Sequence, residues 1–129
     1  MGGTAGLAAL ALAAPTVAPP PRPGPWHQLG AAVTSAPGKP VYFYRMAQSP
    51  TALGIVVVSS SARPITLTWT SYCEIDSDDG PTQDAQGKIT ARRSVVAYPP
   101  VLKDATLCYV WVNAKLLGAG RVAAAEFAY

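Results

Sequence analysis

Apolar and polar side chains alternate along most of the chain from residue 26 onward, and this alternation restricts the possible folds more than any other feature. Successive residues of a β-strand point to opposite faces of a sheet, so a period of two predicts strands that each bury one face. The run ITLTWTSYC at 65–73 is the clearest example, since its odd positions are mostly apolar and threonine fills most of its even ones. Comparable runs lie at 27–35, 41–46, 53–60, 88–98, 106–116 and 121–129.

These runs are short, rich in β-branched and aromatic residues, and separated by turn sequences such as APGKP and SARP. None of them shows helical periodicity. A length of 129 residues, half of them apolar, is enough for one domain with a substantial core. The pattern predicts an all-β fold: an immunoglobulin-like antiparallel β-sandwich of seven or eight short strands with one disulfide.

The run LGIVVVSS at 53–60 is apolar on both faces, as expected of a central strand in a packed sheet. Two further segments depart from simple alternation. The sequence EIDSDDGPTQDAQG at 74–87 is polar, and we expect a long loop there. In the last run, Arg121 and Glu126 have opposite parity, so strict alternation would point one of them inward. We expect a β-bulge among the alanines at 123–125 to restore the register and keep both charges outside.

The chain has two cysteines, Cys73 and Cys108, and each lies on the apolar side of its own predicted strand. In an exported protein such an even pair predicts a disulfide, and the alternative is a pair of buried free thiols in a cytosolic protein. Immunoglobulin domains bridge two facing sheets in this way, so we expect the bond to join facing sheets. The match to that fold is partial, because Trp69 precedes Cys73 in the same strand and no tyrosine stands two residues before Cys108.

The N-terminal residues predict export. The apolar run from Ala5 to Ala14 is shorter than the roughly 20 residues that span a bilayer, and it ends near an A-x-A cleavage sequence at 11–13, with a looser site ending at Ala18. No Lys or Arg precedes it, so either the signal is weak or the true start lies upstream of Met1. The alternative is a short buried helix. We expect a signal peptide at 1–18 and no transmembrane segment.

Proline marks the next segment, since six of the 13 prolines lie between Pro15 and Pro25. Proline fixes φ and lacks an N–H, so this segment cannot join a helix interior or a central strand. We expect a solvated, extended linker at 19–25, followed by the β-sandwich domain at 26–129. The predicted location is secreted or extracytoplasmic.

The stretch CYVWVNAKLLGAGRV at 108–122 resembles the final hairpin of small exported β-sandwich proteins of high-GC Gram-positive bacteria. Those proteins end in a cysteine, alternating small and apolar residues, a glycine turn and a short last strand. The resemblance covers the last third of the chain. It implies an extracytoplasmic β domain and carries no activity with it.

Composition and motifs give little sign of catalysis or of nucleic-acid binding. The net charge is +3, and the basic residues form no cluster larger than Arg92-Arg93, whereas nucleic-acid binders concentrate theirs on one face. The single histidine, His27, stands beside the proline-rich segment, where little would orient it as a base, and no G-x-S-x-G sequence is present. We therefore predict no catalytic residue, cofactor or metal, although a small secreted hydrolase remains an alternative.

The polar loop collects five of the seven acidic residues. Crowded carboxylates in a loop are what Ca²⁺ prefers. The spacing is one residue short of an EF-hand, however, and no glutamate completes it, so a solvated acidic loop is the simpler interpretation. The acids are Glu74, Asp76, Asp78, Asp79 and Asp84.

Aromatic residues supply the candidate binding site. If both cysteines point into the core, their neighbours Tyr72 and Tyr109, together with Trp111, point outward. Such rings stack on sugars or anchor protein interfaces. If the two strands share one sheet, the three rings form a single platform. With the disulfide between facing sheets, which we expect, Tyr72 lies on a different sheet from the other two rings. The alternative is that these rings only cover the outer face of the sheet, for example beneath the segment around Trp26.

Taken together, these features predict a secreted, non-catalytic β-sandwich module with a binding or structural role at the cell exterior. Its partner would be a cell-surface glycan or a protein. The first alternative is a carbohydrate-binding module that uses an exposed aromatic face, and the second is the hydrolase named above.

Export gives a direct prediction. When the gene is expressed with its own N-terminus, the secreted protein should begin between Ala14 and Pro19, because the two candidate cleavage sites end at residues 13 and 18. N-terminal sequencing or intact mass of the secreted material measures this. Recovery of only the full-length chain, and only from the cytosol, would contradict the prediction.

Overall fold

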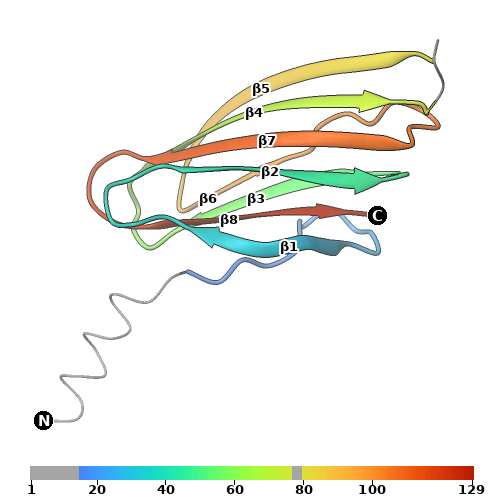
Figure 1. Ribbon diagram of the computed structural model, residues 1–129. Coiled ribbons are helices and arrows are strands. Elements are labelled where there is room, and N and C mark those ends of the chain that lie inside the picture. The colour runs from blue at the N-terminus through green and yellow to red at the C-terminus, as the bar shows by residue number, and fades with distance from the viewer. Residues whose placement is uncertain (1–14, 77–79) are drawn as a thin grey trace, which may run out of the picture.

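A computed structural model describes residues 15–76 and 80–129, and this part of the chain forms eight β-strands (Figure 1). The predicted signal peptide falls largely outside the described residues. Within them, no helix is long and apolar enough to cross a membrane. The strands are β1 His27–Thr34, β2 Val41–Gln48, β3 Leu53–Ser59, β4 Pro64–Glu74, β5 Thr82–Arg92, β6 Ser94–Ala97, β7 Leu107–Leu116 and β8 Val122–Ala128.

The strands form two four-stranded antiparallel sheets, which confirms the β-sandwich. Sheet A has the order β1-β8-β3-β6, and sheet B has the order β2-β7-β4-β5. The first strand pairs with the last, the second with the seventh, the third with the sixth and the fourth with the fifth. This nested pairing is a long hairpin rolled into two layers, the arrangement of a jelly roll.

The immunoglobulin-like assignment is not confirmed by this strand order. In that fold the first two strands share a sheet, whereas here β1 and β2 lie in opposite sheets. Residues 108–122 do not form a hairpin, because β7 belongs to sheet B and β8 to sheet A, so residues 117–121 carry the chain from one layer to the other. A glycine turn followed by an apolar strand suits either connection, which is why the sequence did not separate them.

The core lies between the sheets and is built as the alternation predicts. In β4 the odd positions from Ile65 to Cys73 are buried, and in β7 the even positions from Cys108 to Leu116 are buried. Strand β3 is apolar on both faces, and most of its residues are buried. It lies between β8 and β6 in sheet A.

The predicted polar loop is shorter than expected. Residues 82–92 form β5, an edge strand that pairs with β4 without a break in register. One side of β5 has no strand beside it, so a polar, largely exposed sequence is tolerated there. Arg93, with a φ of +68°, ends this strand, and the chain then crosses to β6 in the other sheet.

The bulge predicted in β8 is wrong. Strand β8 pairs with β3 in unbroken register, and the Glu126 side chain lies inside the sandwich with 1% of its surface exposed. The irregularity lies in the partner strand instead. From Leu29 to Val33, β1 advances four residues while β8 advances only two, from Glu126 to Ala124.

Arg45 occupies the space that this irregularity opens. It points inward from β2, where Nε donates to the carbonyl of Leu29 and Nη2 to that of Ala31, both at 2.9 Å. Gly30 has a φ of +73° and permits the contact, since a Cβ there would lie 2.8 Å from Nε. The bulged backbone thus supplies acceptors for a partly buried guanidinium and ties sheet A to sheet B at this edge.

The Glu126 carboxyl remains without a partner at Oε1 among the described residues. Its burial raises the pKa to about 9, and the positive charge of Arg45 only partly opposes this effect. Burying an ionised carboxylate is far more costly than burying a neutral acid, so the folded protein holds Glu126 protonated near neutral pH.

The proline-rich segment is extended and, apart from Pro20, its residues 19–25 are exposed as expected of a linker, but it also packs against the sandwich. It runs along the outer face of sheet A, where Pro20 is buried and the Arg22 guanidinium lies 3.6 Å from the centre of the Tyr98 ring. The indole of Trp26 donates to the carbonyl of Arg22 at 2.7 Å and meets Tyr129 edge to face at 4.7 Å. That face is apolar because β3 and β8 are apolar on both sides, and the segment covers it.

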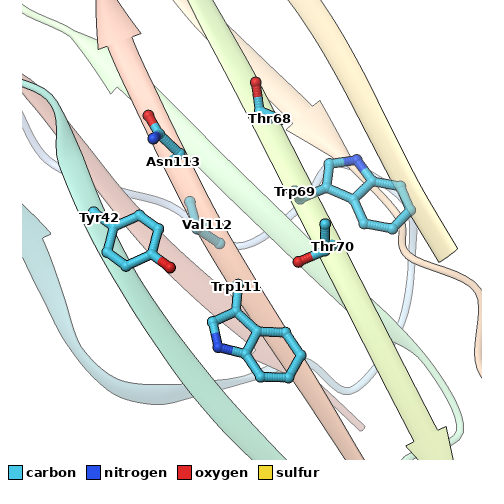
Figure 2. A pocket seen from close by; sticks show the side chains of 7 residues that line it. All are labelled: Tyr42, Thr68, Trp69, Thr70, Trp111, Val112 and Asn113. Carbon is cyan, nitrogen blue, oxygen red and sulfur yellow. The ribbon is translucent and has the colours of Figure 1, made fainter. Parts of the chain in front are cut away.

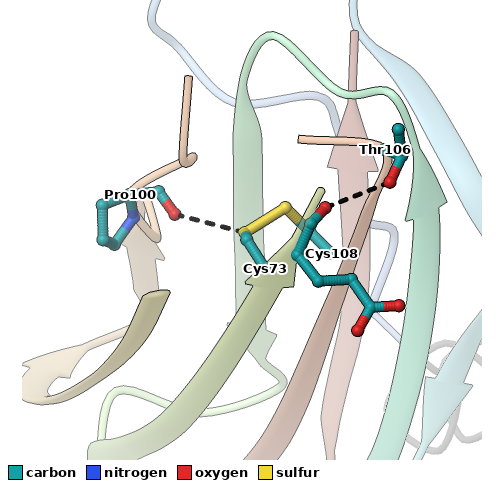
Figure 3. The surroundings of a disulfide bond; sticks show 5 residues. Cys73, Pro100, Thr106 and Cys108 are labelled. Atoms are coloured by element: carbon teal, nitrogen blue, oxygen red, sulfur yellow. Dashed lines mark hydrogen bonds between the residues drawn. A yellow bond between two sulfur atoms is a disulfide. The ribbon is translucent and has the colours of Figure 1, made fainter. Parts of the chain in front are cut away.

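The predicted disulfide between Cys73 and Cys108 is present (Figure 3). Both half-cystines are almost fully buried, and their Cα atoms lie 4.1 Å apart. The two residues are direct partners in the β4–β7 ladder, so the bond joins neighbouring strands of sheet B. The expectation that it joins facing sheets is wrong. Next to it, Thr106 donates through Oγ1 to the carbonyl of Glu74 at 3.2 Å.

Removal of the disulfide should destabilise the protein. The bond closes a loop with a sequence separation of 35, and Cys108→Ala should lower the free energy of unfolding by about 2–5 kcal/mol. Urea unfolding measures the change, and the double variant Cys73→Ala/Cys108→Ala controls for the lone thiol. Wild-type protein that takes up an alkylating reagent in denaturant without reductant would show that the bond is absent.

Glu126→Gln should flatten the dependence of stability on pH. The folded state keeps a proton on Glu126 that the unfolded chain releases. The free energy of unfolding of the wild type should therefore decrease as the pH rises from about 5 to about 9, and Glu126 should contribute up to ~1.4 kcal/mol per pH unit to this decrease. Glutamine does not titrate, so the variant lacks this contribution. Urea unfolding at several pH values compares the two proteins, and parallel pH profiles would show that Glu126 is ionised when buried.

Candidate functional site

The candidate site is the outer face of sheet B. Because the disulfide joins two neighbouring strands, the residues one step from each cysteine emerge on one shared face, and Tyr72 pairs directly with Tyr109. The predicted separation of Tyr72 from the other two rings is therefore wrong, because it assumed a bond between facing sheets. Trp111 is partly exposed on the same face and pairs with Thr70.

Strand β2 extends this surface with rings that the sequence analysis did not single out. Tyr44 pairs with Trp111, and Tyr42 pairs with Asn113. Both tyrosines are more than half exposed, at 57% for Tyr44 and 69% for Tyr42. The alternation of VYFYRM placed them on the face opposite Val41 and Phe43, but only the β2–β7 pairing brings them beside Trp111.

Four rings form a continuous row, which we call the aromatic band. The ring centroids of Tyr44 and Trp111 are 6.3 Å apart, those of Trp111 and Tyr109 are 6.0 Å apart, and those of Tyr109 and Tyr72 are 6.4 Å apart. Their planes differ by only 24–37°. Each ring lies beside the next, so the band crosses from β2 to β4 as a series of rings tilted moderately against one another.

The other half of the face is polar. Thr68 and Thr70 on β4 lie beside Lys88 and Gln86 on β5. These four side chains are exposed. Among the described residues, no hydrogen bond is recorded for the hydroxyls of the two threonines or for the Gln86 amide. Donors and acceptors available to a ligand thus lie along one side of the aromatic band.

Two open hollows flank Trp111, and both are also lined by Thr70. The Asn113 hollow, of about 520 Å³, is further lined by Tyr42, Thr68 and Asn113 (Figure 2). The Asp84 hollow, of about 570 Å³, is lined by Tyr72, Asp84 and Gln86. Figure 2 shows the Trp111 and Trp69 side chains directed apart, and Trp69 is largely buried. Trp111 and Thr70 are therefore the residues that the two hollows share.

The two hollows differ in charge. At the Asp84 hollow, the Tyr72 hydroxyl donates to Oε2 of Glu74 at 3.2 Å. Desolvation raises the pKa of Tyr72, and the hydrogen bond to Glu74 and the negative charges of Glu74 and Asp84 raise it further. At the Asn113 hollow, the nearest charged side chains in the ladder are Lys88, opposite Thr68, and Lys115, opposite Thr66.

The segment around Trp26 does not cover this face. It lies against β3 and β8 on the outer face of sheet A, the opposite side of the sandwich. The alternative in which that segment hides the rings on β4 and β7 is therefore wrong. Of the residues considered at the sequence level, Tyr72, Tyr109 and Trp111 share one accessible face.

Of the remaining candidates, Asp84 lines one hollow of this site and Glu74 accepts the hydrogen bond from Tyr72, whereas the others that the structure describes do not join it. His27 is exposed at the start of β1 in the other sheet. Of the five acids, Asp78 and Asp79 fall outside the described residues, and Asp84 points outward from β5. Across residues 15–76 and 80–129, no group of His, Cys, Asp and Glu side chains has the arrangement of a metal site.

Comparison with known proteins finds no relative of this chain. No family model matches the chain, and no curated protein or solved structure matches it either. The resemblance of residues 108–122 to exported proteins of high-GC Gram-positive bacteria stays a prediction. The functional argument therefore depends on the geometry of the face itself.

Proposed function

We propose that this protein is a non-catalytic binding module that acts outside the cytoplasm, and that the outer face of sheet B is its binding surface. The observation that carries the proposal is the aromatic band from Tyr44 to Tyr72, which runs unbroken across three strands on an uncovered face. Contact between water and the apolar surface of aromatic rings is unfavourable. A folded protein that exposes several rings together on one face is therefore expected to bury them against a partner.

The disulfide supports a location outside the cytoplasm. Structural disulfides persist in oxidising compartments and are rare in the reducing cytosol. Both sulfurs here are buried, and they join the two central strands of sheet B. A bond at this position acts as a structural staple. The signal sequence predicted at the N-terminus agrees with such a location.

Carbohydrate is the ligand class that the face suits best. Sugars present apolar C–H surfaces that stack on aromatic rings and hydroxyls that need hydrogen-bond partners at the ring edges. The aromatic band supplies the first, and Thr70, Gln86 and Asn113 supply the second in the two hollows. A protein interface of the usual size would bury about 800 Å² per partner and concentrate apolar anchors at its centre. Here, exposed polar groups reach the middle of the face.

Trp111→Ala should abolish or strongly weaken glycan binding. The indole borders both hollows and is the largest ring of the aromatic band, and loss of a central aromatic anchor typically weakens binding by more than 2 kcal/mol, or at least about thirtyfold. A glycan array with wild-type protein identifies a binding oligosaccharide, and titration calorimetry then compares the variant.

Leu117→Ala is the matched control, because Leu117 is an exposed apolar side chain at 66%, outside sheet B and away from both hollows. It should bind as wild type does. Circular dichroism and the unfolding midpoint establish that both variants are folded. If no glycan binds, or if Trp111→Ala binds normally, this face is not a carbohydrate site.

A further inference from the structure

The two hollows differ in charge, and this difference indicates which chemical group each of them would bind. The Asp84 hollow combines the Tyr72 and Trp111 rings with a carboxylate and an amide, and none of the described residues that line it is Lys or Arg. Glu74 adds a second negative charge, since it accepts the hydrogen bond from Tyr72. A positively charged group seated there would meet ring faces and a carboxylate together, which is the combination that binds ammonium groups.

The Asn113 hollow has a different character. Its polar lining consists of Thr68, Thr70, the Asn113 amide and the Tyr42 hydroxyl, with no carboxylate among them. Lys88 and Lys115 lie near it in the ladder, so a second positive charge would be repelled there. This hollow suits an uncharged sugar unit whose hydroxyls or amide can form hydrogen bonds with its lining.

The two hollows are joined through Trp111 and Thr70, which line both. A ligand that fills both must therefore be extended and must pass across the Trp111 indole. Tyr44 and Tyr109 both lie beside that indole, with ring centroids 6.3 and 6.0 Å from it, and these contacts restrict its orientation before the ligand arrives. A preformed ring of this kind lowers the entropy lost on binding.

We propose that the face binds an amino-sugar oligosaccharide of at least two units, with a free amino group in the Asp84 hollow and an uncharged unit in the Asn113 hollow. The inference rests on the carbohydrate-binding function proposed above and narrows its ligand class. Charge complementarity, rather than ring stacking alone, selects the ligand. A partly de-N-acetylated chain of N-acetylglucosamine has this combination of units.

The experiment compares three tetrasaccharides on the full chain: one partly de-N-acetylated, one fully N-acetylated and one of glucose. Below the pKa of the sugar amine, wild-type protein should bind the first about tenfold more tightly than the other two. Asp84→Asn should remove that preference, so that the ratio of the affinities for the partly de-N-acetylated and the fully N-acetylated chain falls to about one. Raising the pH above the pKa of the amine should remove it in the wild type as well.

Asp104→Asn is the matched control for net charge, because Asp104 is exposed and lines neither hollow. It should keep the preference for the free amine. Equal affinity of the wild type for all three sugars, or a preference that survives Asp84→Asn, would overturn the amino-group assignment while leaving carbohydrate binding in place. No binding of any of the three sugars, together with an empty glycan array, would overturn both proposals.

Discussion

The candidate site depends on the pairing of β4 with β7, which the disulfide between Cys73 and Cys108 fixes. The bond holds two direct partners of the β4–β7 ladder together, so it sets the register of the two central strands of sheet B. A shift of one residue would send every side chain of one strand to the other face. With this register, Tyr72 lies opposite Tyr109 and Thr70 lies opposite Trp111. The staple in the core thereby determines which rings meet on the surface.

Strand β2 completes the surface from the other side of β7. It pairs with β7 over its whole length without a break, which brings Tyr44 beside Trp111. Strand β2 is itself held by Arg45, whose guanidinium reaches two carbonyls in the irregular part of β1. An edge strand with such a link to the facing sheet is less prone to fray. The same side chain thus stabilises the sandwich edge and supports the end of the aromatic band.

The two outer faces of the sandwich differ in whether another part of the chain covers them. On sheet A, apolar residues of β3 and β8 are covered by the proline-rich segment, with Pro20 and Trp26 against Gly54. Proline suits this cover because it extends the chain without needing a ladder hydrogen bond. On sheet B, rings of comparable size lie open beside exposed threonines and amides. One face is closed by the chain itself, and the other remains available to a ligand.

The sequence by itself determined the β-sandwich, the alternation of the core strands, the disulfide pair and the outward direction of Tyr72, Tyr109 and Trp111. These follow from local periodicity and from the number of cysteines, which need no knowledge of strand order. Only the tertiary structure decided that the disulfide lies within one sheet, that Tyr44 joins the aromatic band and that Glu126 is buried. These depend on which strands are neighbours and on where an irregularity is absorbed, and alternation within one strand carries no information about its neighbours.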